Sequence, residues 1–331
     1  MPCTQARREM AAVVAAFGLS AMLGFFVVGP IAKGGAGAHP GAAAARFVPL
    51  APMPGAGRLG AARSVRTPVG DVGTLPRRGP RAAALAQRRA DILASAATTP
   101  QLYVYDHCPF CVRVRLALGI LQVPHRLVFL ENDDVDTPTA LVGKKISPIW
   151  VDGDGAMAES LDIIAKIDTE KKIAPASGRK DLKEWQKTVQ EINRKLQRPR
   201  YVMVPLPEFM KKAGRDAFVE NHQMPPYEKS EWKGNPDMPL EAKYAKYQEA
   251  FADTASLLPE LNKALVELEP LIASPEACTE GIGVSYDDID LWARLRSLTV
   301  IKGVELPPGV RAYLDHFEKA GDVPLYDVMA V

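Results

Sequence analysis

One stretch of this chain constrains the fold more than any other, and it reads Tyr-Val-Tyr-Asp-His-Cys-Pro-Phe-Cys over residues 103–111. Its β-branched and aromatic start predicts a strand, and the apolar pattern of residues 112–118 predicts a helix. A strand that leads into a Cys-x-x-Cys pair at the start of a helix indicates a redox-active dithiol.

The expected position of Cys108 explains why such a thiol would react. At the N-terminus of a helix, unpaired backbone N–H groups and the helix dipole favour an anion, so the pKa of Cys108 should fall. Cys111 lies one turn later on the same side and is positioned to resolve a mixed disulfide. Pro109 suits the first helical turn, where its missing N–H is not needed.

Other roles for these cysteines remain open at this point. The pair could be structural, although the chain has only two further cysteines, Cys3 and Cys278. A metal or cluster site would require a second cysteine pair or a histidine cluster, and neither is visible in the sequence. Because His107 precedes the dithiol, the order is not that of haem attachment.

The charges are unevenly distributed along the 331 residues, which are long enough for two domains. Residues 1–99 carry a net charge of +9, and the remainder carries −7. A basic N-terminal segment followed by an acidic remainder suggests a targeting segment. The remainder has no basic stripe in its sequence, so we expect no nucleic-acid binding.

The first 99 residues have the composition of a presequence. Residues 10–29 are apolar and uncharged, about long enough to span a bilayer, and small residues follow. Residues 32–99 contain ten Lys or Arg, two Asp and no Glu, and cannot bury enough apolar surface to fold alone. The whole resembles a bipartite plastid presequence. A secretory signal, a membrane anchor through 10–29 and a mitochondrial signal are the alternatives. We therefore predict that 1–99 are largely disordered.

Residues 100–178 predict a compact α/β unit. Strands are expected at 102–105 and 125–129, with a helix over 111–121 between them. The Asp-Gly-Asp-Gly run at 152–155 indicates a hairpin turn, and residues 159–167 predict a helix.

Residues 179–331 predict a helical domain. Leu182, Trp185, Val189, Ile192 and Leu196 follow a helical period, and helices are also expected over 240–258 and 259–271. Residues 201–239, rich in proline and aromatic residues, predict a long connection with a short helix near 208–218. Ser285 and Asp288 resemble a capping box that opens a helix, and the last long helix is expected from Pro307 and Pro308 to about 320.

Several motifs together resemble the large glutaredoxins of glutaredoxin 2 type. They are Tyr-Asp-His-Cys-Pro-Phe-Cys (105–111), Asn-Asp-Asp-x-x-Thr-Pro-Thr (132–139), Val-Gly-Lys-Lys-x-x-Pro-Ile (142–149), Met-x-Glu-Ser-x-Asp-Ile (157–163) and Asp-Asp-Ile-x-Leu-x-x-x-Leu-Arg-x-Leu-Thr (287–299). The resemblance covers roughly 100–331, and 201–256 is its loosest part. It implies an α/β thioredoxin-like domain followed by an all-α domain like the C-terminal domain of glutathione S-transferases.

The resemblance also implies an activity and a set of site residues. The activity is glutathione-dependent reduction of protein disulfides and protein–glutathione mixed disulfides, with Cys108 as nucleophile and Cys111 as resolving thiol. Glutathione, the co-substrate, would contact Cys108, Phe110, Ser147, Pro148, Glu159 and Ser160. Phe110 stands where the family usually has Tyr.

Each glutathione contact has a physical rationale. Pro148 matches the family's cis-proline, whose partner Ser147 would pair with the glutathione backbone. Ser160 and the helix-start N–H groups suit the γ-glutamyl carboxylate, and Glu159 suits its ammonium group. Ordinary alternatives are a strand-edge proline and a common helix N-terminus. Candidate cations for the glycine carboxylate are Arg113, Arg115, Lys144 and Lys145, and the sequence does not choose among them.

Some questions stay open in the sequence. His107 would either promote thiolate formation or serve as a spacer, and Cys278 should be buried in the helical domain. A glutathione transferase and a non-catalytic glutathione-binding protein are the competing functions, and the intact dithiol argues against both. We expect no metal, and we expect a monomer.

Overall fold

The computed structural model describes residues 79–331. The apolar segment 10–29, Cys3 and most of the predicted presequence lie outside the described residues. Within residues 79–331, no helix is both long and apolar enough to cross a bilayer.

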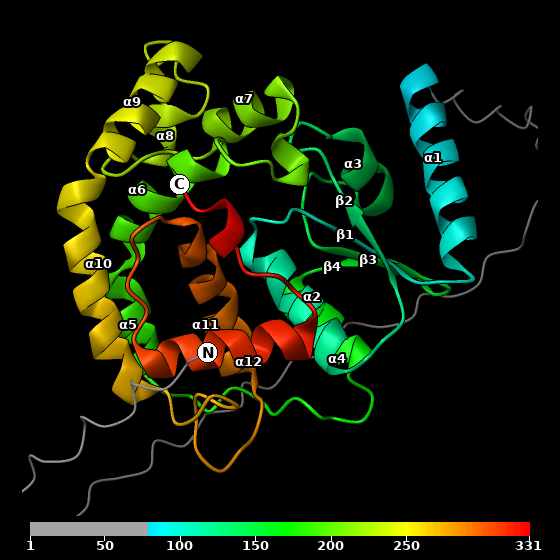
Figure 1. Cartoon of the computed structure of the whole chain (residues 1–331). Helices are drawn as coiled ribbons and strands as arrows, with labels where there is room; N and C mark the ends of the chain where they lie inside the picture. Colours follow the sequence, from blue (N-terminus) through cyan, green and yellow to red (C-terminus); the bar gives the residue numbers. More distant parts are fainter. Residues whose placement is uncertain (1–78) are drawn as a thin grey trace, which may run out of the picture. The chain divides into compact units, whose positions relative to one another are not determined.

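The first part of the described chain is built on a four-stranded sheet (Figure 1). Its strands are β1 (Gln101–Val104), β2 (Arg126–Phe129), β3 (Ile149–Asp152) and β4 (Gly155–Ala158), in the order β2-β1-β3-β4. β1 is parallel to β2 and antiparallel to β3, and β3 is antiparallel to β4. β3 and β4 are joined across Gly153 and Asp154, so the predicted hairpin turn is confirmed.

Both faces of this sheet are covered. Leu102, Val104 and Trp150 enter the main core, whereas their neighbours Tyr103 and Ile149 enter a second core on the other face. This alternation follows from the two-residue period of a strand. The main core contains α2 (Pro109–Ile120) and α4 (Ser160–Ile167), and the second is covered by α1 (Pro80–Ala96) and α3 (Asp136–Val142).

Helix α1 lies in the segment that we expected to be largely disordered. Its Ile92, Leu93 and Ala96 pack into the second core with Tyr103 and Ile149. Arg81 pairs with Asp136 at 2.9 Å, and Arg88 and Arg89 donate hydrogen bonds to α3. Residues 80–96 are therefore an ordered part of the fold, because the sheet supplies the apolar surface that this segment lacks by itself.

Helices make up the rest of the chain. They are α5 (Asp181–Thr188), α6 (Gln190–Tyr201), α7 (Lys212–Asn221), α8 (Lys229–Trp232), α9 (Leu240–Ala252), α10 (Thr254–Leu268), α11 (Tyr286–Arg296) and α12 (Pro308–Gly321), with the short 3₁₀ helices η1 (Pro207–Phe209), η2 (Glu269–Leu271), η3 (Ser297–Val300) and η4 (Asp327–Met329). α11 and α12 pack on α2, so α2 is enclosed between the sheet and the helical domain. A helix enclosed in this way is apolar nearly all round.

Several predicted boundaries differ from the structure. The periodic pattern of 182–196 is divided at Val189 into α5 and α6. The break expected before Pro259 lies instead at Asp253, and Pro259 is inside α10. The connection 201–239 contains more helix than predicted, namely η1, α7 and α8. The capping box of Ser285 and Asp288 at the start of α11 is confirmed.

Candidate active site at the dithiol

Cys108 and Cys111 lie where α2 begins, directly after the strand β1. Cys108 is the N-cap residue, Pro109 is the first helical residue, and the Cys108 carbonyl oxygen accepts the first helical hydrogen bond from Val112 at 3.0 Å. Both cysteines are free thiols, and Cys111 is fully buried. The predicted placement of the pair at a helix N-terminus is confirmed.

The two thiols differ in acidity. The pKa of Cys108 is lowered to about 6, chiefly by a hydrogen bond from the Cys111 thiol. The charge of His107 and backbone N–H groups contribute less, and burial acts in the opposite direction. Burial raises the pKa of Cys111 well above its ordinary value, and the interaction with Cys108 raises it further. Near neutral pH the site therefore holds one thiolate, at Cys108, and one thiol, at Cys111.

Ser147 holds the buried thiol through its side chain, a contact that the sequence did not predict. Its Oγ lies 3.1 Å from the Cys111 sulfur and donates a hydrogen bond to the Tyr103 carbonyl oxygen at 3.1 Å. The Tyr105 N–H also points to the Cys111 sulfur, at 3.4 Å.

The sheet register brings the other predicted residues to the same edge. Tyr103 pairs with Ile149, and Ile149 pairs with Ala158, so the residues after Tyr103, before Ile149 and after Ala158 are neighbours. The Ser147–Pro148 peptide bond is cis, as predicted. Ser160 is the buried first residue of α4. Glu159 precedes it with φ of 76°, and its side chain is 61% exposed.

The four candidate cations have different surroundings. Arg113 binds Asp290 of α11 through Nε at 3.0 Å, and its guanidinium lies 4.7 Å from the centre of the half-exposed Phe110 ring. Arg115 is buried and paired with Asp106. Lys144 lies 3.7 Å from Glu159, and Lys145 donates to the Asn132 carbonyl oxygen at 2.5 Å. The two lysines are exposed, and the two arginines are already held in ion pairs.

The helical domain contributes residues that the sequence did not identify. Glu208 of η1 accepts hydrogen bonds from His107, the residue before the nucleophile. Arg296 of α11 binds both carboxylate oxygens of Asp106 at 3.2 Å. The one visible signal was a single acidic residue in the apolar run 204–210. Cys278 is buried in this domain, as predicted, and burial raises its pKa to about 12.

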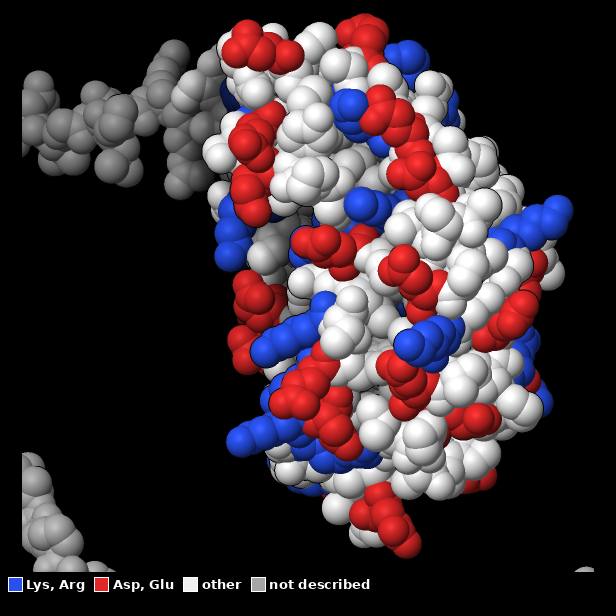
Figure 2. Space-filling view, turned by 90° about the vertical axis from the view of Figure 1, so that its left-hand side faces the viewer, with Lys and Arg blue, Asp and Glu red and all other residues white. Residues whose placement is uncertain are grey.

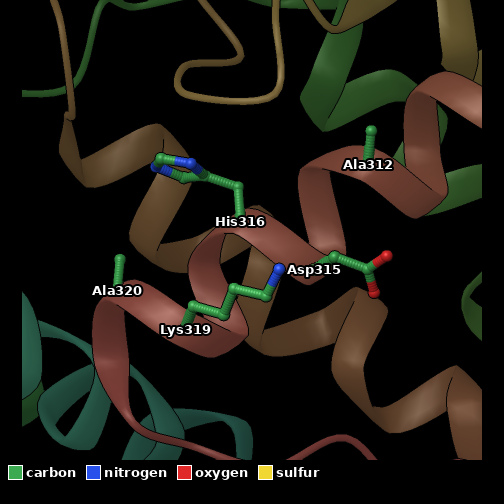
Figure 3. Close-up of a pocket in the computed structure, with 5 residues that line it drawn as sticks. All are labelled: Ala312, Asp315, His316, Lys319 and Ala320. Carbon is green, nitrogen blue, oxygen red and sulfur yellow. The ribbon is translucent and has the colours of Figure 1, made fainter.

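Other parts of the described surface show weaker candidates for a functional site. A shallow hollow on α12 is lined by Ala312, Asp315, His316, Lys319 and Ala320, all from this one helix (Figure 3). On the face shown in Figure 2, acidic and basic side chains are interspersed without a continuous basic stripe. Within residues 79–331 no three His, Cys, Asp or Glu side chains are grouped to hold a metal ion.

Comparison with known proteins agrees with this geometry in both domains. Residues 102–174 match the family model of the glutathione S-transferase N-terminal domain, and residues 240–330 match that of the glutaredoxin 2 C-terminal domain. Glutaredoxin 2 of Escherichia coli strain K12 is 31% identical over 234 residues, which are 70% of this chain and 100% of that protein. A crystal structure of glutaredoxin 2 from Salmonella typhimurium in complex with glutathione superposes with a TM-score of 0.60. It is 30% identical and covers 70% of this chain and 99% of its own.

Proposed function

Since this chain belongs to the glutaredoxin 2 family of glutathione-dependent oxidoreductases, we propose that it reduces protein disulfides and protein–glutathione mixed disulfides through Cys108 and Cys111. The observation that carries this proposal is the placement of the partly buried Cys108 and the fully buried Cys111 at the start of α2, which favours a thiolate at Cys108 and a thiol at Cys111. A reactive thiolate next to a thiol that stays protonated is the arrangement that thiol–disulfide exchange requires.

For a glutathionylated protein, the Cys108 thiolate attacks the glutathione sulfur, and the protein leaves as a thiolate that takes up a proton. A second glutathione thiolate then attacks the Cys108–glutathione disulfide. This releases glutathione disulfide and restores Cys108. Neither step uses Cys111.

For a protein disulfide, Cys108 first forms a mixed disulfide with one substrate sulfur. Cys111 then loses its proton and attacks the sulfur of Cys108, which releases the reduced substrate and leaves a Cys108–Cys111 disulfide. Two molecules of glutathione reduce that disulfide and become glutathione disulfide. The Ser147 hydroxyl and the Tyr105 N–H, both in contact with the Cys111 sulfur, hold it ready for this step.

We place glutathione along the sheet edge that carries Phe110, Ser147, Pro148, Glu159 and Ser160. The Ser147 backbone would pair with the cysteine of glutathione. The N-terminus of α4 with Ser160 would bind the γ-glutamyl carboxylate, and the exposed Glu159 would bind the ammonium group. Lys144 and Lys145 are better candidates for the glycine carboxylate than the two paired arginines, because binding there would break no buried ion pair. We further propose that the protein acts as a monomer.

A glutathione-conjugating transferase is the second candidate, because residues 102–174 match a transferase domain model. The experiment that separates the two uses the full chain and its Cys108→Ser and Cys111→Ser variants. Each is assayed for glutathione-dependent reduction of a small mixed disulfide and of a protein disulfide. We expect Cys108→Ser to be inactive on both. Cys111→Ser should keep part of its activity on the mixed disulfide and lose its activity on the protein disulfide.

One result would decide for the transferase. If the wild-type chain fails to reduce either disulfide but couples glutathione to an electrophile, the oxidoreductase proposal is wrong and Cys111 is incidental.

A further inference from the structure

A buried carboxylate of the helical domain is bonded to the residue that precedes the nucleophile. Oε1 of Glu208 accepts a hydrogen bond from the His107 backbone N–H at 2.9 Å, and it lies 2.6 Å from Nδ1 of the His107 ring. The Glu208 side chain has no exposed surface. Its Oε2 has no hydrogen-bond partner among the described residues. A buried structural carboxylate is normally paired with Arg or Lys, whereas this one bonds through its side chain to His107.

The position of Glu208 is fixed from two sides. Its carbonyl oxygen accepts a hydrogen bond from the Asn132 N–H at 3.2 Å, which ties η1 to the α/β domain. Gly214 of α7 packs so closely on this carbonyl that a Cβ at Gly214 would lie 2.3 Å from the oxygen. The carboxylate is therefore presented to His107 by backbone contacts from both domains, not by a mobile loop.

The surroundings of His107 make Glu208 its main charged partner. The aromatic rings of Tyr201, Phe209 and Phe218 lie with centroids 5.0 to 5.3 Å from the imidazole, and Tyr105 stacks on it at 5.9 Å.

The titratable groups around His107 are Glu208 from η1, His222 after α7 at 6.4 Å, and the rings of Tyr105 and Tyr201. Cys108 follows His107 in the chain. Burial lowers the pKa of His222 to about 3, so that ring is neutral. Asp106 is engaged by Arg115 and Arg296. A positive charge on His107 would be costly in this aromatic environment without the Glu208 carboxylate.

We propose that Glu208 is a positioning residue for the reaction: it holds the ring of His107, the residue before Cys108, so that the helical domain influences the ionisation of the nucleophile. This inference rests on the proposed role of Cys108 as the attacking thiolate. The charge of His107 is one of the causes of the lowered pKa of Cys108. The Cys108 proton goes to solvent, and His107, which is held by Glu208, stabilises the anion that remains.

The test is the pH dependence of Cys108 alkylation by iodoacetamide, followed by peptide mass spectrometry on the reduced full chain. This readout needs no glutathione, so it stays informative if the proposed activity fails. We expect a midpoint near pH 6 for the wild type. In Glu208→Gln, which keeps the shape and one acceptor oxygen, the midpoint should rise by about one pH unit. At pH 6 the alkylation rate should then fall about fivefold, as the thiolate fraction does.

Glu220→Gln is the matched control in the same domain. Glu220 binds the buried Lys243 at 2.6 Å within the helical domain, away from the dithiol residues in sequence and hydrogen bonding. This variant should lower the melting temperature and leave the alkylation midpoint unchanged. The proposal is overturned if folded Glu208→Gln keeps the wild-type midpoint, or if Glu220→Gln shifts it equally.

A measurement on the wild type covers the case in which Glu208→Gln does not fold. In the reduced full chain labelled with ¹⁵N-histidine, Nδ1 of His107 should carry the proton that is bonded to Glu208. Alkylation of Cys108 should change the nitrogen shifts of this ring. A His107 ring whose Nδ1 carries no proton would contradict the proposal.

Discussion

Asp106 joins the two domains directly behind the dithiol. Its carboxylate is bound by Arg115 of α2 and by Arg296 of α11, and its carbonyl oxygen accepts hydrogen bonds from Arg296 at 3.0 Å and Tyr326 at 2.9 Å. Burial alone would raise the pKa of Asp106, but the charges of Arg296 and Arg115 outweigh burial and lower it to about 2. The loop that carries Cys108 is therefore fixed by one ion pair within the α/β domain and by a second that comes from the helical domain.

Replacing this carboxylate should be costly. Asp106→Asn leaves the buried Arg296 without its charged partner, so we expect the free energy of unfolding at pH 7 to fall by about 3 kcal/mol. Because the pKa of Asp106 is lower in the folded protein than its ordinary value of 3.8, the ionised carboxylate stabilises the wild-type fold fully at pH values above 3.8. That contribution is lost as the pH falls through about 2, and the variant should lack it.

Urea unfolding at several pH values measures both effects. Asp315→Asn is the control, because its pair with Arg311 is partly exposed and should contribute about 0–1 kcal/mol. Equal losses in the two variants would show that the buried pair has no special role.

At the scale of elements, α2 and α12 cross at two glycines. A Cβ at Gly119 would lie 2.0 Å from the Gly321 carbonyl oxygen, and a Cβ at Gly321 would meet the Leu116 side chain at 2.4 Å. The absence of both side chains lets the helical domain pack directly on the helix that bears the dithiol. We expect Gly119→Ala to lower the free energy of unfolding by about 1–3 kcal/mol through overpacking.

Gly153→Ala is the comparison for this change. Gly153 lies in the turn between β3 and β4, and its added Cβ would have no atom within 4 Å. Chemical denaturation should show a change within about 0.5 kcal/mol for it. If Gly119→Ala unfolds at the same denaturant concentration as Gly153→Ala, the close helix contact is not important for stability.

The elements also show what the sequence could and could not reveal. The strand, dithiol and helix of 101–120 were predictable, because local propensity, motif and helix-terminus chemistry agree there. Helix α1 was not predictable, because its Arg-rich, acid-poor composition matches a presequence. The apolar surface on which it packs belongs to the sheet. The sequence predicts a helix start at Pro259, but α10 already begins at Thr254. Glu208 is bonded to a residue 101 positions away, and a single sequence does not show that these two residues pair.

At the scale of the whole molecule, the helical domain encloses the helix that carries the dithiol. α11 and α12 cover α2, while Glu208 and Arg296 bind the residues just before Cys108. The reactive thiol is thus set between two domains that are tied by buried polar contacts. Because α1 belongs to the fold, we propose that any removal of an N-terminal presequence, in a plastid or elsewhere, occurs before residue 79.

The central claim is that Cys108 exchanges disulfides with glutathione. Its most direct test incubates the full chain carrying Cys111→Ser with glutathione disulfide and maps the adduct by mass spectrometry. We predict a glutathione on Cys108, removed again by excess reduced glutathione. Cys278→Ser, which removes a buried thiol with a pKa of about 12, should not change this adduct on the Cys111→Ser background. No adduct on Cys108, or an adduct on Cys278 in its place, would contradict the account.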